Sequence, residues 1–152
     1  MTTALSILQK HFGHAAFRGA QLAIIRRLTE APNRGGHSLV LMPTGGGKSL
    51  CYQIPALIFD GGTLVISPLI ALMQDQVDAL RRRNIPATFI NSTVNAEERE
   101  SRLRGFLKGD YKLLYVTPER FRRTEFTQAI TRANIALLAV DEAHCVSEWG
   151  HD

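Results

Sequence analysis

The sequence is short of cysteine and of long apolar runs, and each shortage excludes a class of protein. Only two of its 152 residues are cysteine, Cys51 and Cys145, and they form no CxxC pair. Two such residues build no disulfide framework, so we expect reduced thiols. The uncharged stretch at residues 61–74 contains Gly, Ser and Pro and is shorter than the roughly 18 apolar residues of a membrane span. The apolar segment 4–8 runs straight into a polar stretch with Lys10, so we expect a soluble protein without an export signal or a membrane partner.

Acidic side chains are also scarce, but only in the first part of the chain. Residues 1–59 carry six basic side chains against one acidic, whereas residues 60–152 carry twelve against thirteen. The resulting net charge of +4 is compatible with an anionic ligand or a nucleic acid and is weak evidence alone. A hydrophobic share of 45% and a charged share of 21% are ordinary for a globular protein and exclude a disordered or fibrous chain. The length predicts one domain.

Apolar strands alternate with helices along the chain. Hydrophobic spacing predicts helices over 4–11, 19–30, 69–83 and 124–133, one from Lys48 to about Phe59 with a kink or end at Pro55, and one that a capping box opens at Asn95 and Gly109 closes. Predicted strands are 38–42, 63–66, 87–90, 112–116 and 136–140. This order predicts an α/β fold, a parallel sheet with helices on both faces, whose ligands bind at the carboxyl ends of the strands.

A glycine-rich segment follows the first predicted strand and opens a helix. Its residues are Pro43, Thr44, Gly45, Gly46, Gly47, Lys48 and Ser49. In that setting backbone N–H groups surround the phosphates of a nucleotide, the lysine reaches the β- and γ-phosphates, and the serine hydroxyl binds Mg²⁺. Met42 stands where the general phosphate-loop pattern has Gly, which favours the helicase form of the loop. The alternative is a glycine-rich turn with a surface lysine.

Two acids end the last predicted strand. Asp141 would hold Mg²⁺, and Glu142 would accept a proton from the attacking water. His144 could sense the γ-phosphate. The alternative is an acidic helix start that favours the helix dipole. His144, Cys145 and His151 lack a fourth ligand at fitting spacing, so we expect no structural zinc site.

Taken together, the motifs resemble the RecQ family of DNA helicases. The matching pieces are Phe12-Gly13, Phe17-Arg18 with Gln21, MPTGGGKSLCYQIPA at 42–56, SPLIALMQDQV at 67–77, TPER at 117–120 and DEAHCVSEWGHD at 141–152. The resemblance implies a RecA-like P-loop NTPase domain that uses ATP and Mg²⁺, within an enzyme that moves 3′ to 5′ on single-stranded DNA and unwinds duplex junctions in repair and recombination. DEAH alone is shared by many helicases, whereas the runs after GGGKS and DEAH are more specific.

The resemblance also implies roles for further residues. Gln21 and Arg18 would contact adenine, and His14 stands where the family usually has a stacking tyrosine. Trp149 and His144 would couple DNA binding to hydrolysis. DNA-contacting residues would be Ser67, Pro68, Asn91, Ser92, Thr117, Pro118, Glu119, Arg120 and Trp149. For each of these segments a purely structural turn is the alternative, and for Arg81-Arg82-Arg83 a solvated helix end is favoured over a phosphate patch.

The chain stops at Asp152, before other segments that the family has. We expect residues 1–152 to be a helicase ATP-binding domain truncated at its C-terminus, incomplete there in its sheet, without the second RecA-like domain or the zinc-binding and winged-helix regions. The predicted partners are single-stranded DNA, duplex junctions and that second domain. The expected location is the cytoplasm, on the nucleoid in a bacterium. A truncated non-catalytic nucleotide- and DNA-binding fragment is the alternative, and a small P-loop kinase a third possibility.

Overall fold

The computed structural model describes residues 3–30, 40 and 47–142. The chain divides into two compact units, Met1–Asp60 and Gly61–Asp152. The predicted strand 38–42 lies outside the described residues apart from Val40.

The first unit is helical in its described part. It holds α1 (Ala4–Phe12), α2 (Gln21–Thr29) and α3 (Leu50–Ile58), and both α1 and α2 pack against α3. Helix α1 opens on a capping box in which Thr3 and Ser6 each accept from the other's backbone N–H at 3.1 Å. It ends at Gly13, whose φ of 70° is the left-handed conformation that terminates helices. These caps fix the length of α1 and position its apolar face, Ile7, Leu8 and Phe12, for burial.

Pro55 lies inside α3 and does not end it. The helix continues to Ile58, and the N–H of Phe59 donates to the Pro55 carbonyl at 2.9 Å. A proline in a helix interior removes one backbone hydrogen bond, a cost that tertiary packing can outweigh. Every side chain from Cys51 to Ala56 is buried, so packing holds this helix through the proline.

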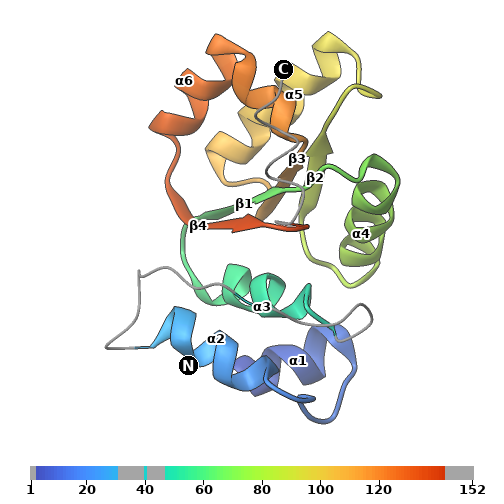
Figure 1. The fold of residues 1–152 in the computed structure, drawn as a ribbon, viewed down its shortest axis with the longest axis vertical. Helices are drawn as coiled ribbons and strands as arrows, with labels where there is room; N and C mark the ends of the chain where they lie inside the picture. The colour runs from blue at the N-terminus through green and yellow to red at the C-terminus, as the bar shows by residue number, and fades with distance from the viewer. Residues whose placement is uncertain (1–2, 31–39, 41–46, 143–152) are drawn as a thin grey trace. The chain divides into compact units, whose positions relative to one another are not determined.

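The second unit is a parallel sheet with helical crossovers (Figure 1). Its elements are β1 (Gly62–Ile66), α4 (Ile70–Arg82), β2 (Ala87–Ile90), α5 (Ala96–Lys108), β3 (Leu113–Val116), the 3-10 helix η1 (Pro118–Arg122), α6 (Thr124–Arg132) and β4 (Ile135–Val140). The strand order is β2-β3-β1-β4, and every neighbouring pair is parallel. The predicted α/β class and parallel sheet are therefore confirmed.

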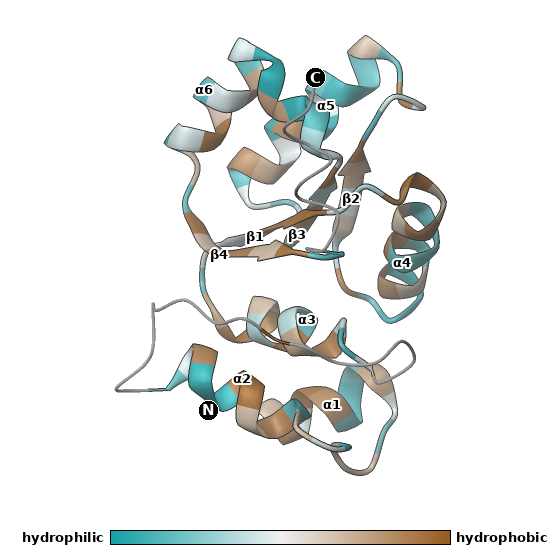
Figure 2. Cartoon of the chain, viewed as in Figure 1, coloured by the Kyte–Doolittle hydropathy of each residue, from teal (hydrophilic) through white to brown (hydrophobic). Residues whose placement is uncertain are grey.

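The three strands β1, β2 and β3 are buried on both sides, which explains their continuous apolar sequences. Leu64, Ile90 and Leu114 point to one face, where they form a core with Phe106 of α5 and Phe126 of α6. On the opposite face α4 packs against β2 and buries Met73, Val77 and Leu80. Figure 2 shows the strands in hydrophobic colours and hydrophilic patches on α4 and α5.

The cap of α5 matches its prediction in part. The Asn95 side chain accepts from the N–H of Glu98 at 2.8 Å, and Gly109 closes the helix at φ 89°. The Glu98 carboxylate, which a capping box would direct back to Asn95, binds Arg102 on the next turn at 3.1 Å. Only the asparagine half of the predicted box is seen.

Candidate nucleotide and nucleic-acid site

The end of the predicted phosphate loop turns directly into α3. The N–H of Leu50 donates to the Gly47 carbonyl at 3.3 Å, and the N–H of Cys51 to the Lys48 carbonyl at 3.0 Å. Ser49 is the N-cap residue, yet its hydroxyl makes no capping bond to the helix. The first backbone donors of α3 are therefore used within the turn itself, whereas the Ser49 hydroxyl is not used for capping. Thr44, Gly45 and Gly46 lie outside the described residues.

Gln21 connects the segment predicted to contact adenine with the phosphate loop. The residue is 2% exposed, its Nε2 donates to the Gly47 carbonyl at 3.1 Å, and its Oε1 accepts from the Arg18 N–H at 2.8 Å. It is therefore not a solvated helix residue. Because an amide carries two N–H donors and two acceptor lone pairs, these two bonds use half of its hydrogen-bonding capacity.

Gly47 has a backbone conformation that favours glycine, in a space that leaves no room for a Cβ. Its φ is +75°, and a Cβ placed on it would overlap Nε2 of Gln21. The same position would be 3.6 Å from Nη2 of Arg18, so Arg18, Gln21 and Gly47 form one cluster. His14, by contrast, has an exposed side chain on the loop after α1.

Asp141 and Glu142 follow β4 at the carboxyl end of the sheet. The N–H of Asp141 donates to the Ile66 carbonyl at 2.8 Å, which extends the β4–β1 pairing to the aspartate itself. Oδ1 of Asp141 accepts from the N–H of Glu142 at 2.9 Å, and Glu142 has a φ of 58°. A left-handed glutamate is uncommon, and such conformations occur often at functional sites. His144 and Trp149 lie outside the described residues.

Each of the four strands ends in a loop that carries predicted site residues. Following the strand order, Asn91 and Ser92 come after β2, Thr117 to Arg120 after β3, Ser67 and Pro68 after β1, and Asp141 and Glu142 after β4. The N–H of Ser67 donates to the Val116 carbonyl at 3.0 Å, so the middle loops are also bonded to a neighbouring strand. Those of the predicted DNA contacts that the structure describes therefore form one row with the two acids, along the carboxyl ends of the strands.

Two of these side chains have structural bonds. Asn91 is fully buried, donates to Sδ of Met73 at 3.5 Å, and accepts from the N–H of Thr93 at 2.9 Å. This shapes the loop and leaves Ser92, which is exposed, as the member of the pair that can reach a ligand. Ser67 is buried, and its hydroxyl accepts from the N–H of Leu69 at 3.3 Å.

The loop after β3 holds polar atoms that lack partners. Thr117 is 1% exposed, and among the described residues neither its Oγ1 nor the buried Nε of Arg120 has a hydrogen-bond partner. Burial lowers the pKa of Arg120, and the charges of Arg99 and Arg123 lower it further, whereas Glu119 opposes this. A guanidinium beside two like charges favours an anion nearby. The contributions of Arg99 and Arg123 cannot be found from sequence, because neither residue belongs to a motif.

Within residues 3–30 and 47–142, no three His, Cys, Asp or Glu side chains gather as a metal cluster. In that same described part of the chain, no helix has the length and apolarity to span a membrane.

The sequence model of the DEAD/DEAH box helicase family matches residues 18–152. The chain belongs to this family of helicase domains. Within this family, the resemblance to RecQ enzymes is confirmed, because the identity extends over nearly the whole chain and not only over the DEAH motif. The chain is 52% identical over 149 residues to the ATP-dependent DNA helicase RecQ of Bacillus subtilis, and 50% identical over 150 residues to that of Haemophilus influenzae. These matches cover 98% and 99% of this chain but only 25% and 24% of those proteins.

The fold is that of a helicase RecA-like domain. A hypothetical ATP-dependent RNA helicase from Sulfolobus tokodaii superposes with a TM-score of 0.74 over 99% of this chain and 44% of that one. Since the two sequences are 21% identical, this likeness concerns the fold alone.

Proposed function

We propose that this chain is the ATP-binding half of a RecQ-like 3′–5′ DNA helicase, which couples ATP hydrolysis to movement along single-stranded DNA and to duplex unwinding in repair and recombination. The observation that carries the proposal is the row of loops at the carboxyl ends of the strands, where predicted DNA contacts lie next to the two acids after β4. Such an arrangement would let DNA in one loop affect the hydrolytic residues in the next.

The nucleotide would bind at the start of α3. Lys48 would hold the β- and γ-phosphates, the backbone of Gly47 to Ser49 would line the phosphates, and Arg18 and Gln21 would contact the adenine. Mg²⁺ would be held by Ser49 and Asp141, a hydroxyl and a carboxylate of the kind it prefers, with phosphates and water completing the shell. When bound, the ion neutralises charge that develops on the phosphates.

Glu142 would act as the general base of hydrolysis. Its backbone is held by the bond from its own N–H to Asp141, and Asp141 is itself bonded to β1. A carboxylate held in this way can orient a water molecule and take its proton without a large reorganisation. His144 and Trp149 are proposed to relay the state of the γ-phosphate to the DNA.

The protein would hold DNA by its phosphate backbone and would not read its base sequence. Ser67, Pro68, Ser92, Thr117, Pro118, Glu119 and Arg120 offer hydroxyls, backbone N–H groups and one partly buried guanidinium, which suit phosphate oxygens. Oγ1 of Thr117 and Nε of Arg120, which lack a partner in the described part of the chain, support this role. Asn91 would act through the shape of its loop.

The first experiment measures ATP affinity by titration calorimetry. Lys48→Ala should abolish binding, because it removes the positive charge of the phosphate loop. Lys10→Ala, which removes the same charge from an exposed position of α1, is the matched control and should bind as the parent does. Equal affinity in Lys48→Ala and the parent would contradict the nucleotide site.

The second experiment tests the activity of the whole enzyme. Residues 1–152 replace the matching segment of the Bacillus subtilis RecQ protein, and the chimera is assayed for DNA-stimulated phosphate release and for unwinding of a duplex with a 3′ single-stranded tail. The chimera should do both. A folded chimera that binds ATP but shows no response to DNA would contradict the helicase function and favour a non-catalytic nucleotide-binding fragment.

A second RecA-like domain and duplex junctions are the proposed partners, and the cytoplasm, on the nucleoid in a bacterium, is the proposed location. The support for the second domain is the share of the RecQ relatives that the chain spans, about a quarter of their length.

A further inference from the structure

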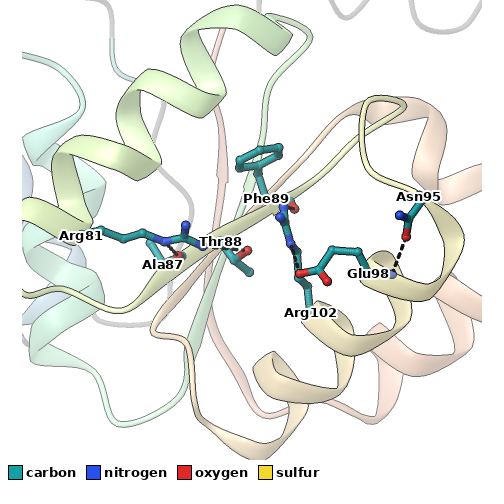
Figure 3. Close-up of polar contacts among 7 residues, drawn as sticks. All are labelled: Arg81, Ala87, Thr88, Phe89, Asn95, Glu98 and Arg102. Atoms are coloured by element: carbon teal, nitrogen blue, oxygen red, sulfur yellow. Dashed lines mark hydrogen bonds and ion pairs between the residues drawn. The ribbon is translucent and has the colours of Figure 1, made fainter.

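Two arginines cover the outer edge of strand β2. Strand β2 stands at the end of the strand order, and among the described strands its one neighbour is β3. The carbonyl of Pro86 accepts from Lys112 on the β3 side, so the alternate carbonyls of Ala87 and Phe89 point away from β3. Nε of Arg81 donates to the Ala87 carbonyl and Nη1 of Arg102 to the Phe89 carbonyl, each at 2.9 Å (Figure 3).

The two arginines come from opposite faces of the sheet. Arg81 lies in the last turn of α4, whereas Arg102 lies in the middle of α5. Each passes around the edge to a side chain of the other face. Nη2 of Arg81 lies 3.3 Å from the hydroxyl of Thr88, which alternates onto the α5 side, and the Arg102 guanidinium lies 4.7 Å from the centroid of the Phe89 ring. Together they bind both outward carbonyls of this four-residue strand.

Arg102 is held in place by a chain of contacts. Its Nε pairs with Glu98 at 3.1 Å, the N–H of Glu98 is bonded to the Asn95 side chain, and only 18% of the Arg102 side chain is exposed. A partly buried, stacked and hydrogen-bonded arginine is a stronger interaction than an exposed ion pair such as Arg104–Glu100 on the same helix. The contact of Arg102 with the edge strand is thus fixed by its neighbours in and before α5.

Such an edge would otherwise recruit another strand. The sequence Ala-Thr-Phe-Ile combines β-branched and aromatic residues, and unpaired outward carbonyls offer a template for pairing. Natural sheets protect their edges with charged side chains. Here the charge is used directly, because the guanidinium groups occupy the acceptors that an incoming strand would need.

We infer that Arg81 and Arg102 form an edge clamp, whose function is to prevent β2 from pairing with the β2 strand of a second copy of this chain. The partner is a second copy because two β2 strands laid antiparallel about a two-fold axis set the outward N–H groups of each strand against the outward carbonyls of the other. The inference is independent of the proposed helicase function.

The test replaces both arginines with methionine, which keeps the apolar stem and removes the guanidinium. Arg81→Met/Arg102→Met should associate, with an apparent association constant raised roughly tenfold for each freed carbonyl, the equivalent of about one net hydrogen bond. Sedimentation velocity over a range of protein concentrations measures this. Adding Ala87→Pro to the double variant should restore the monomer, because proline on an edge strand removes an outward N–H.

The matched control is Arg82→Met/Arg104→Met. It removes the same two charges from the same two helices without touching β2, and it should sediment as the parent does. A folded clamp variant that stays monomeric, or one that associates no more than the control, would overturn the inference. If Arg81→Met and Arg102→Met each lose the far-ultraviolet circular dichroism of the parent, the arginines hold the fold and do not guard the edge, and the inference is again overturned.

Discussion

The side-chain amide of Gln21 donates a hydrogen bond to the backbone carbonyl of Gly47, 26 residues away in sequence, at 3.1 Å. This bond joins the start of α2 to the last glycine before Lys48. The oxygen of the same amide accepts from Arg18. A hydrogen bond thus connects the residue proposed to contact the base with the loop proposed to hold the phosphates. A substitution in one should therefore change the position of the other.

Gly47→Ala should therefore lower both stability and ATP affinity. The added methyl group meets Nε2 of Gln21, and alanine at a left-handed φ costs roughly 1–2 kcal/mol in backbone energy alone. We expect a loss of unfolding free energy above that range, measured by urea denaturation, and a weaker ATP isotherm.

Gly13→Ala is the control for the backbone term. Gly13 has a φ of +70° and nothing within 4 Å of an added Cβ, so alanine there has the left-handed cost without a clash. Equal losses of unfolding free energy in the two variants would show that the clash with Gln21 does not contribute to the destabilisation.

Glu142→Gln should separate ATP binding from hydrolysis in the chimera. The amide is the same size as the carboxylate but cannot accept a proton, so turnover should fall roughly 10²- to 10⁴-fold while ATP affinity stays near that of the parent. Phosphate release and calorimetry measure the two quantities. Glu100→Gln, on an exposed ion pair of α5, is the control and should leave turnover unchanged. A change in turnover below about threefold in Glu142→Gln would rule out the general-base role, given the usual size of that effect.

Much of the fold can be predicted because its signals are local. Continuous apolar runs such as Thr63–Ile66 predict strands buried on both faces, and they are. The stop at Gly109 depends only on glycine's access to a positive φ, which the structure shows. The capping box of α1 escapes the sequence pattern, because Ser6 stands where the pattern has Glu or Gln.

The side-chain bonds at the candidate site are harder to predict. Whether Asn91 faces a ligand or Met73 depends on where α4 packs, and sequence spacing says nothing of that. The same holds for Arg81, for which the sequence predicts a solvated helix end and which in fact bonds to β2. Long polar side chains find partners across elements, so their contacts follow from tertiary packing and not from local pattern.

The cap of α5 gives a prediction about stability. Asn95→Ala removes the only described side-chain bond to the Glu98 N–H and should cost ~1 kcal/mol of unfolding free energy. In a full capping box Glu98→Ala would cost a similar amount through Asn95. Here Glu98 pairs with Arg102, so we expect at most a few tenths of a kcal/mol, as for a helix i,i+4 pair. Urea denaturation of both variants distinguishes the two arrangements. Equal losses of unfolding free energy would show that Glu98 also caps the helix through Asn95.

Arg120 provides the test of DNA binding. Arg120→Gln in the chimera should weaken binding to a single-stranded oligonucleotide, and it should reduce the slope of log affinity against log salt by ~0.7, the loss of one phosphate contact on a single strand. Fluorescence anisotropy at several salt concentrations measures both. Arg132→Gln removes the same charge from the last turn of α6 and should leave the slope unchanged.

Thr117→Val completes the test because it separates binding from folding. The buried hydroxyl of Thr117 has no partner among the described residues, so its loss should not destabilise the fold and can even stabilise it. If the hydroxyl contacts a phosphate, DNA affinity falls while the urea midpoint holds or rises. A variant with a lower midpoint and unchanged DNA affinity would show that Thr117 is a structural residue, and an unchanged salt slope in Arg120→Gln would then remove the loop after β3 from the DNA path.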